Sequence, residues 1–230
     1  MDFRQLFHKI RNRITKIRLE PIRVFCFHQV SDKFDESTMW KCDWMSIVDF
    51  KEKIIALQEK YMFISLSEAN QKLENDTFRS KKYAVLTMDD AGNCIVDLMP
   101  WLAERNIPIT LFLPYSFITR EKTEHKCGIS LTEVQLNDLL QRYPELVTIA
   151  NHGFNHNSAY EVSIEELVSD IERNEKALKK YVSKIPFYAY PGGHHTSKTD
   201  AVVYKMGFTP VYCDGGVNYN DCNFIHRELL

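Results

Sequence analysis

The chain has 230 residues, of which 44% are hydrophobic and 12% aromatic, and its formal net charge at pH 7 is −2. A chain of this size and composition can bury one sizeable core, and a charge this close to zero lacks the basic excess typical of nucleic-acid-binding proteins. The six cysteines are scattered without a Cys-x-x-Cys pair. That spacing favours reduced thiols in a cytosolic protein, although the even number leaves disulfide bridges open.

The first 20 residues differ from the rest of the chain in charge. They carry six Lys or Arg residues and two acidic residues, so their charge of +4 leaves −6 for the remainder. Apolar side chains recur there at helical spacing, but no apolar stretch is long enough for the core of a secretion signal or for a membrane span. We expect a basic amphipathic helix over 1–20 that either contacts an anionic membrane surface or packs on the protein body. The expected location is the cytoplasm or the inner face of the membrane.

Residues 21–230 alternate between strand and helix patterns, with no repeat or linker that would divide them. Apolar runs predict strands at 23–27, 62–64, 83–88, 109–113, 147–150, 187–190, 211–213 and 224–227. Helical patterns predict helices at 47–61, 95–105 and 198–206, and Ser67 can cap a further helix that runs through about residue 73. Capping boxes predict helix starts at Ser130 and Ser163. The alternation favours one α/β domain with a parallel sheet, either open or closed into a barrel.

Two adjacent carboxylates, Asp89 and Asp90, follow the expected strand 83–88. Neighbouring anions repel each other, so the pair indicates either a solvated turn or a site that holds a cation or a proton. His152 and His156 follow a second apolar strand, with three residues between them. Because the carboxyl ends of parallel strands meet on one face of a barrel, these four side chains can converge. A carboxylate and two imidazoles form a three-ligand site for a divalent metal, with one position left for water.

The sequence resembles the NodB-type polysaccharide deacetylases, also called carbohydrate esterase family four. The family motif Thr-Phe-Asp-Asp-Gly is similar to Thr-Met-Asp-Asp-Ala at 87–91, and His-[Ser/Thr]-x-x-His-Pro is similar to His-Gly-Phe-Asn-His-Asn at 152–157. The region around His28 and the stretch 50–69 also look like the N-terminal part of this family. The resemblance covers most of residues 23–228.

This resemblance implies a distorted (β/α) barrel and a role for each motif residue. It implies that Asp90, His152 and His156 hold a divalent metal, for which zinc is the expected ion, and that Asp89 is the catalytic base. The third family motif, Arg-x-Pro-Tyr, is similar to Ala-Tyr-Pro-Gly at 189–192, which implies an oxyanion-hole role for the backbone N–H of Gly192. The fifth motif, Leu-x-His, is similar to Ile225-His226, which implies that His226 is the general acid.

The arginine of the third motif, which orients the catalytic aspartate in the family, is replaced by Ala189. Arg227 is the candidate replacement, because the last strand of a closed barrel pairs beside the first and can present a side chain at the same mouth. The alternative is a surface arginine near a frayed C-terminus.

Five further residues are expected to contact substrate. His28 follows the first strand, Tyr190 and Pro191 belong to the third motif, and His194 follows the Pro-Gly-Gly turn, where it lines a sugar cleft or lies on a loop surface. Trp44 lies in an irregular polar segment and either stacks on a sugar ring or packs locally.

The expected function is metal-dependent hydrolysis of an N- or O-acetyl group on an amino sugar of a polysaccharide or glycan precursor. Two alternatives stay open at this stage. One is a hydrolase of the same fold that cleaves another C–N bond, such as a cyclic amide. The other is a catalytically impaired member that binds a glycan through the same cleft.

Overall fold

The structure is a computed structural model that describes residues 21–75, 77, 81–122, 128–219 and 223–230. The helix expected over 1–20 lies outside the described residues. Nine strands of the described chain form one parallel sheet: β1 (Arg23–Phe27), β4 (Met62–Phe63), β5 (Tyr83–Met88), β6 (Ile109–Leu113), β7 (Val147–Asn151), β8 (Phe187–Ala189), β9 (Thr209–Tyr212), β10 (Ile225–His226) and β11 (Glu228–Leu229). A small second sheet pairs β2 (Gln29–Val30) with β3 (Trp44–Met45).

The last residues of the chain close the sheet into a barrel. The strand order is β10-β9-β8-β7-β6-β5-β1-β11, and β10 and β11 are separated by Arg227 alone. One C-terminal segment therefore pairs with β9 on one side and with β1 on the other. The barrel is distorted because β4 and β6 both pair with β5, at successive positions along it. The predicted distorted barrel is confirmed.

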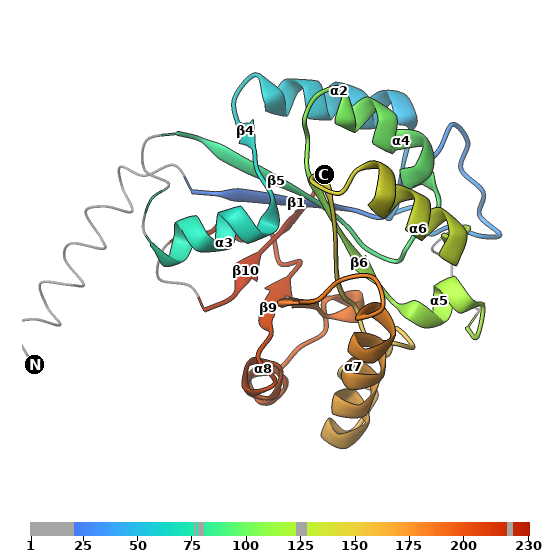
Figure 1. Ribbon diagram of the computed structural model, residues 1–230, viewed down its shortest axis with the longest axis vertical. Coiled ribbons are helices and arrows are strands. Elements are labelled where there is room, and N and C mark those ends of the chain that lie inside the picture. Colours follow the sequence, from blue (N-terminus) through green and yellow to red (C-terminus); the bar gives the residue numbers. More distant parts are fainter. Residues whose placement is uncertain (1–20, 76, 78–80, 123–127, 220–222) are drawn as a thin grey trace, which may run out of the picture.

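Helices surround this barrel (Figure 1). They are α2 (Ile47–Gln58), α3 (Leu66–Glu74), α4 (Cys94–Ala103), α5 (Tyr115–Thr119), α6 (Glu133–Arg142), α7 (Ile164–Leu178) and α8 (Ser197–Lys205), and a short 3-10 turn spans Pro191–Gly193. Ser163 caps α7 through a capping box, as expected. The cap of α3 is Ser65, not Ser67, and that of α6 is Thr132, not Ser130, because these hydroxyls accept the N–H three residues later.

Strand side chains alternate between two apolar clusters. Val24, Val85 and Val211 belong to a cluster inside the barrel, which is completed by Leu66, Ala69 and Leu73 of α3. Their strand neighbours Phe25 and Leu86 belong to the larger cluster between the barrel and the outer helices. Because successive side chains of a strand point to opposite faces, this alternation decides which residues beyond each strand end face the barrel mouth.

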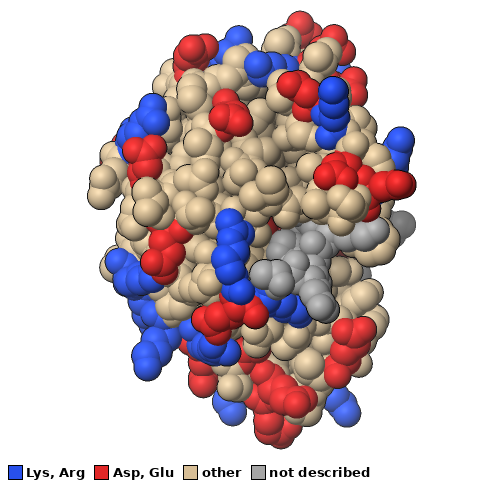
Figure 2. Space-filling model, turned by 90° about the vertical axis from the view of Figure 1, so that its right-hand side faces the viewer, with Lys and Arg blue, Asp and Glu red and all other residues tan. Residues whose placement is uncertain are grey.

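Figure 2 shows one face of the molecule, where basic and acidic side chains are interspersed. Within the described part of the chain, none of the helices has both the length and the apolar character needed to cross a membrane.

Candidate active site

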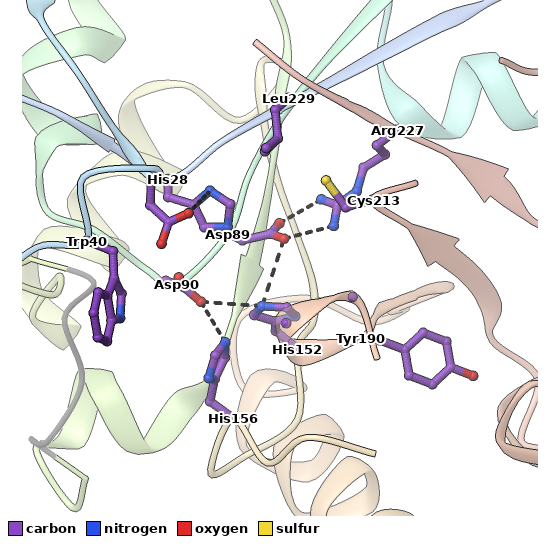
Figure 3. A pocket seen from close by; sticks show the side chains of 13 residues that line it. His28, Trp40, Asp89, Asp90, His152, His156, Tyr190, Cys213, Arg227 and Leu229 are labelled. Atoms are coloured by element: carbon purple, nitrogen blue, oxygen red, sulfur yellow. Dashed lines mark hydrogen bonds and ion pairs between the residues drawn. The ribbon is translucent and has the colours of Figure 1, made fainter. Parts of the chain in front are cut away.

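The two carboxylates lie at the carboxyl end of β5, where each residue is only 3% exposed. Asp90 and Ala91 have φ angles of 68° and 55°. This left-handed conformation costs a non-glycine residue about 1–2 kcal/mol. The strained turn directs the two carboxylate side chains toward different partners. Asp89 faces Arg227, and Asp90 faces the two histidines (Figure 3).

The two histidines belong to the segment that follows β7. The Nδ1 atom of His152 lies 2.9 Å from the carbonyl oxygen of Ala189, so the ring donates its Nδ1–H there and directs the lone pair of Nε2 toward Asp90. His156 adopts a φ angle of 54°, which turns its ring back toward the same carboxylate. A buried carbonyl therefore sets the tautomer of His152, as is usual for histidines that bind metals.

Asp90, His152 and His156 fit a divalent metal. One ligand atom from each lies within 4.8 Å of the other two. Asp90 Oδ1 is buried without a hydrogen-bond partner, 2.9 Å from His156 Nε2 and 3.4 Å from His152 Nε2. Burial acts to raise the pKa of the Asp90 carboxyl, but electrostatic interactions with the adjacent imidazoles of His156 and His152 outweigh it and hold this pKa well below its ordinary value. An anionic carboxylate and two lone-pair nitrogens around one point are a typical set of zinc ligands.

Asp89 is held by Arg227 and not by the histidines. The guanidinium donates from Nη1 to Oδ1 at 2.7 Å and from Nη2 to Oδ2 at 2.8 Å, a bidentate pair in which Arg227 is 1% exposed. His152 Nε2 is farther away, 3.9 Å from Asp89 Oδ2. Burial acts to raise the pKa of the Asp89 carboxyl, but the positive charge of Arg227 overcomes it and lowers this pKa. Asp89 therefore stays ionised with its orientation set by two hydrogen bonds.

A cavity of about 350 Å³ opens over these groups. Besides Asp89, Asp90, His152 and His156, its lining includes His28, Trp40, Asp43, Gly192 and Gly193. His28 Nδ1 lies 4.0 Å from Asp43 Oδ1. The cavity thus combines carboxylates, imidazoles and an aromatic ring in a space large enough for a sugar-sized group.

The structure places Tyr190 in the cavity lining but does not bring His226 there. His226 precedes Arg227 in the closing strand, so its ring points to the opposite face, where Nδ1 lies 2.6 Å from Asp214 Oδ2. Tyr190 follows the inward Ala189, and its ring points away from the cavity into the outer cluster beside Tyr188. Only the main chain of Tyr190 can contribute to the cavity wall.

Three other expected substrate contacts also lie outside the cavity lining. Trp44 donates its indole N–H to Ser31 Oγ at 2.8 Å and packs on Phe34. His194 interacts with Ser158 Oγ through Nδ1 at 2.8 Å and stacks on Tyr160. Pro191 is buried in the 3-10 turn and shapes the backbone that presents Gly192. These three side chains support the cavity walls. Trp40, in place of Trp44, presents an aromatic ring to the cavity.

Sequence reasoning missed Cys213 and Asp43, which line the cavity, and Cys26 below it. Cys213 directly follows β9, so the convergence of strand ends on one face could have identified it. Asp43 lies in an irregular loop, where no periodic pattern indicates direction.

A family model described as polysaccharide deacetylase matches residues 77–211, more than half of the chain. IcaB from Ammonifex degensii has a similar structure, with 21% identity, a TM-score of 0.78 and coverage of 92% of each chain. Streptococcus pyogenes deacetylase PplD, solved in complex with acetate, has 18% identity, a TM-score of 0.77 and coverage of 91% of this chain and 92% of that one.

The deacetylase domain of BpsB from Bordetella bronchiseptica is also similar, with 18% identity, a TM-score of 0.70 and coverage of 92% of this chain and 96% of that one. At these identities the structural likeness shows the fold alone. Among curated proteins, none matches this sequence.

Proposed function

Because this chain belongs to the polysaccharide deacetylase family, we propose that it is a metal-dependent hydrolase that removes an acetyl group from an amino sugar of a polysaccharide or glycan precursor. The observation that carries this proposal is the convergence of Asp90, His152 and His156 beside a separate carboxylate, Asp89, that Arg227 holds in a fixed orientation. Asp90 faces the two histidines, so Asp89 is the carboxylate that stays free for proton transfer.

Asp90, His152 and His156 would hold the divalent ion, and zinc suits a carboxylate with two imidazoles. When bound, the ion would supply Lewis acidity, which polarises an acetamide carbonyl and makes water a better acid.

Asp89 takes a proton from the attacking water. Its carboxylate is ionised and buried, and its position next to Asp90 puts it within reach of a nucleophile directed at the same point. Arg227 keeps both oxygens in place, which takes over the function of the arginine that Ala189 replaces. The backbone N–H of Gly192, at the cavity wall, serves the developing oxyanion.

His28 protonates the leaving amine in place of His226. Its ring lines the cavity and lies beside Asp43, which can stabilise the imidazolium, whereas His226 faces the other side of its strand. Among the described cavity-lining residues, the other two imidazoles belong to the metal cluster. His28 thus changes from an expected substrate contact to the proton donor.

The test is acetate release from a panel of acetylated glycans by the metal-loaded full chain. We expect Asp89→Asn to keep the metal held by Asp90, His152 and His156 and to lose turnover by about a hundredfold or more, because it removes the base and none of these three ligands. Asp90→Asn should lose both metal and turnover. Asp138→Asn, an exposed acid on α6, is the matched control and should change neither. Equal metal loss in the two active-site variants would contradict the division of roles. Metal-loaded protein that releases no acetate from any glycan would contradict the activity.

A further inference from the structure

A second group of metal-ligating side chains lies on the other side of Asp89. One ligand atom each from Cys26, His28 and Asp89 lies within 4.8 Å of the other two. The thiol of Cys213 hydrogen-bonds the thiol of Cys26. Two thiols, an imidazole and a carboxylate therefore gather at the barrel mouth, and both cysteines are free. The proposed reaction uses neither thiol.

The barrel closure brings these groups together. Cys26 lies on β1 in register with Leu229, and Cys213 follows β9 at the level of Arg227. Leu229 and Arg227 face the cavity, so the cysteines beside them on the flanking strands face the same way. Cys26 is fully buried, whereas Cys213 lines the cavity and gives an ion access from solvent.

The charges at this position suit a divalent ion. The three negative charges of two thiolates and the Asp89 carboxylate would balance the three positive charges of a divalent ion and the Arg227 guanidinium. Each carboxylate oxygen of Asp89 accepts one hydrogen bond from Arg227 and keeps a further lone pair for a ligand bond. The Nε–H of Arg227 is buried without an acceptor in the described structure, so an adjacent thiolate would also satisfy it.

The two thiols differ in how readily they ionise. A hydrogen bond from the Cys26 thiol and the charge of Arg227 lower the pKa of Cys213 to about 7, against the effect of burial. Burial raises the pKa of Cys26 well above its ordinary value. Cys213 is the entry ligand because it lines the cavity, whereas Cys26 lies buried behind it.

We propose that Cys26, Cys213, His28 and Asp89 form a second metal site, selective for thiophilic divalent ions such as Zn²⁺ and Cd²⁺ over Mg²⁺. The selectivity follows from the thiolates, which hard ions bind poorly. An ion held there occupies Asp89 and His28 at once, and so removes both the base and the proton donor. This inhibitory consequence rests on the proposed function, whereas the binding itself does not.

Binding is tested with Co²⁺ as the probe, added to the metal-free, reduced full chain under nitrogen. The wild type should bind two ions per chain, and one of them should give the near-ultraviolet charge-transfer band of a cobalt–thiolate bond. Cys213→Ser should bind its second ion at least about tenfold more weakly and show a weaker band at saturation, because only the Cys26 thiolate remains. His152→Ala should keep the band while it loses the other ion. Circular dichroism confirms that each variant is folded.

The matched control is Cys42→Ser, which removes an exposed thiol and should keep both ions and the band. A band in Cys213→Ser with the intensity and affinity of the wild type, or a wild type that binds one ion and shows no band, would overturn the second site. Cys26→Ala risks the fold because its side chain is buried, so Cys213→Ser carries the test.

Inhibition is measured separately, on protein that is loaded with one zinc ion per chain and releases acetate. Excess Cd²⁺ should lower wild-type turnover by at least about tenfold, whereas the same excess of Mg²⁺ should not, and Cys213→Ser should lose most of the Cd²⁺ effect. Equal inhibition of the wild type and Cys213→Ser would overturn the inhibitory role. A protein without deacetylase activity would refute the proposed function, while the Co²⁺ titration would still decide whether the second site exists.

Discussion

Arg227 is the residue whose position most affects the proposed chemistry. We expect Arg227→Ala to lower turnover by about tenfold or more with metal content unchanged, because Asp89 would lose both hydrogen bonds that orient it. The free energy of unfolding should also fall by about 3–5 kcal/mol, since the variant leaves a buried carboxylate unpaired. Steady-state kinetics, metal analysis and urea denaturation measure the three effects.

Arg23→Ala is the matched control for this prediction. Arg23 pairs with Glu228, which also joins β1 to the closing strand, but both side chains are partly exposed and neither lines the cavity. We expect full turnover and a loss of about 1 kcal/mol or less. Arg227→Lys keeps the charge without the bidentate geometry and should remain impaired. Turnover of Arg227→Ala equal to that of Arg23→Ala would refute the orienting role.

The thiol of Cys213 should show its lowered pKa as reactivity. In metal-free protein, the rate of its alkylation by iodoacetamide should rise through about pH 7, where half of Cys213 is thiolate, the reactive form. Cys42 is the comparison, because desolvation and the Asp43 carboxylate raise its pKa, so its rate should rise at higher pH. Peptide mapping by mass spectrometry across pH separates the two sites. The same midpoint for both thiols would contradict the prediction.

At the scale of elements, α7 holds the segment that carries the two histidines. Asp170 accepts hydrogen bonds from the backbone N–H and the side-chain amide of Asn155. Gly153 has a φ angle of 69°, and a Cβ there would lie 2.6 Å from an Asp170 carboxylate oxygen. The glycine thus allows the helix carboxylate to approach the segment closely. Asn174 adds hydrogen bonds to the carbonyl of Leu113 and to the side chain of Asn151.

We expect Asp170→Ala to weaken metal binding at Asp90, His152 and His156 by about tenfold to a hundredfold. The ligands remain, but the segment that places His156 loses the hydrogen bonds of Asn155. Isothermal titration of the metal-free protein with Zn²⁺ measures the affinity. Glu172→Ala, on the exposed side of the same helix, should leave it unchanged. Wild-type affinity in Asp170→Ala would show that the segment holds its shape without the helix.

At the scale of the whole molecule, residues 1–20 concentrate positive charge on a chain that is otherwise negative. We propose that they bring the protein to anionic membranes, and we expect the full chain to sediment with anionic vesicles in a salt-sensitive way. A chain that starts at Pro21 should stay in the supernatant, and neutral vesicles serve as the control. Identical sedimentation of the two proteins would contradict a membrane role for this segment.

Closure of the barrel by the last residues depends on contacts between parts of the chain that are far apart in the sequence. Asn218 is fully buried, donates to the carbonyl oxygens of Ile22 and His226 and accepts from the N–H of His226. Asn218 thus ties the start of β1 to β10. The position of Arg227, which orients Asp89, therefore depends on contacts between the two ends of the described chain. The site is complete only when the barrel is closed.

The sequence by itself was sufficient for the strand and helix order, because apolar runs and capping residues are local signals. It also located Asp89, Asp90, His152 and His156, since motif residues at strand ends need only the rule that such ends meet on one face. Boundaries were less accurate. The caps of α3 and α6 are Ser65 and Thr132, and several hydroxyls near each start have the same local pattern.

Only the tertiary structure decided which side chains beyond the strand ends enter the cavity. Alternation already implies that His226 and Arg227 cannot both face the mouth, but the choice between them depends on the register with β9, which no local pattern determines. The register of β8 with β9, in which Ala189 lies beside Val211, turns the ring of Tyr190 outward. The registers of the closing segment with β9 and with β1 bring Cys213 to Cys26, because that contact joins distant segments through pairing and not through sequence proximity.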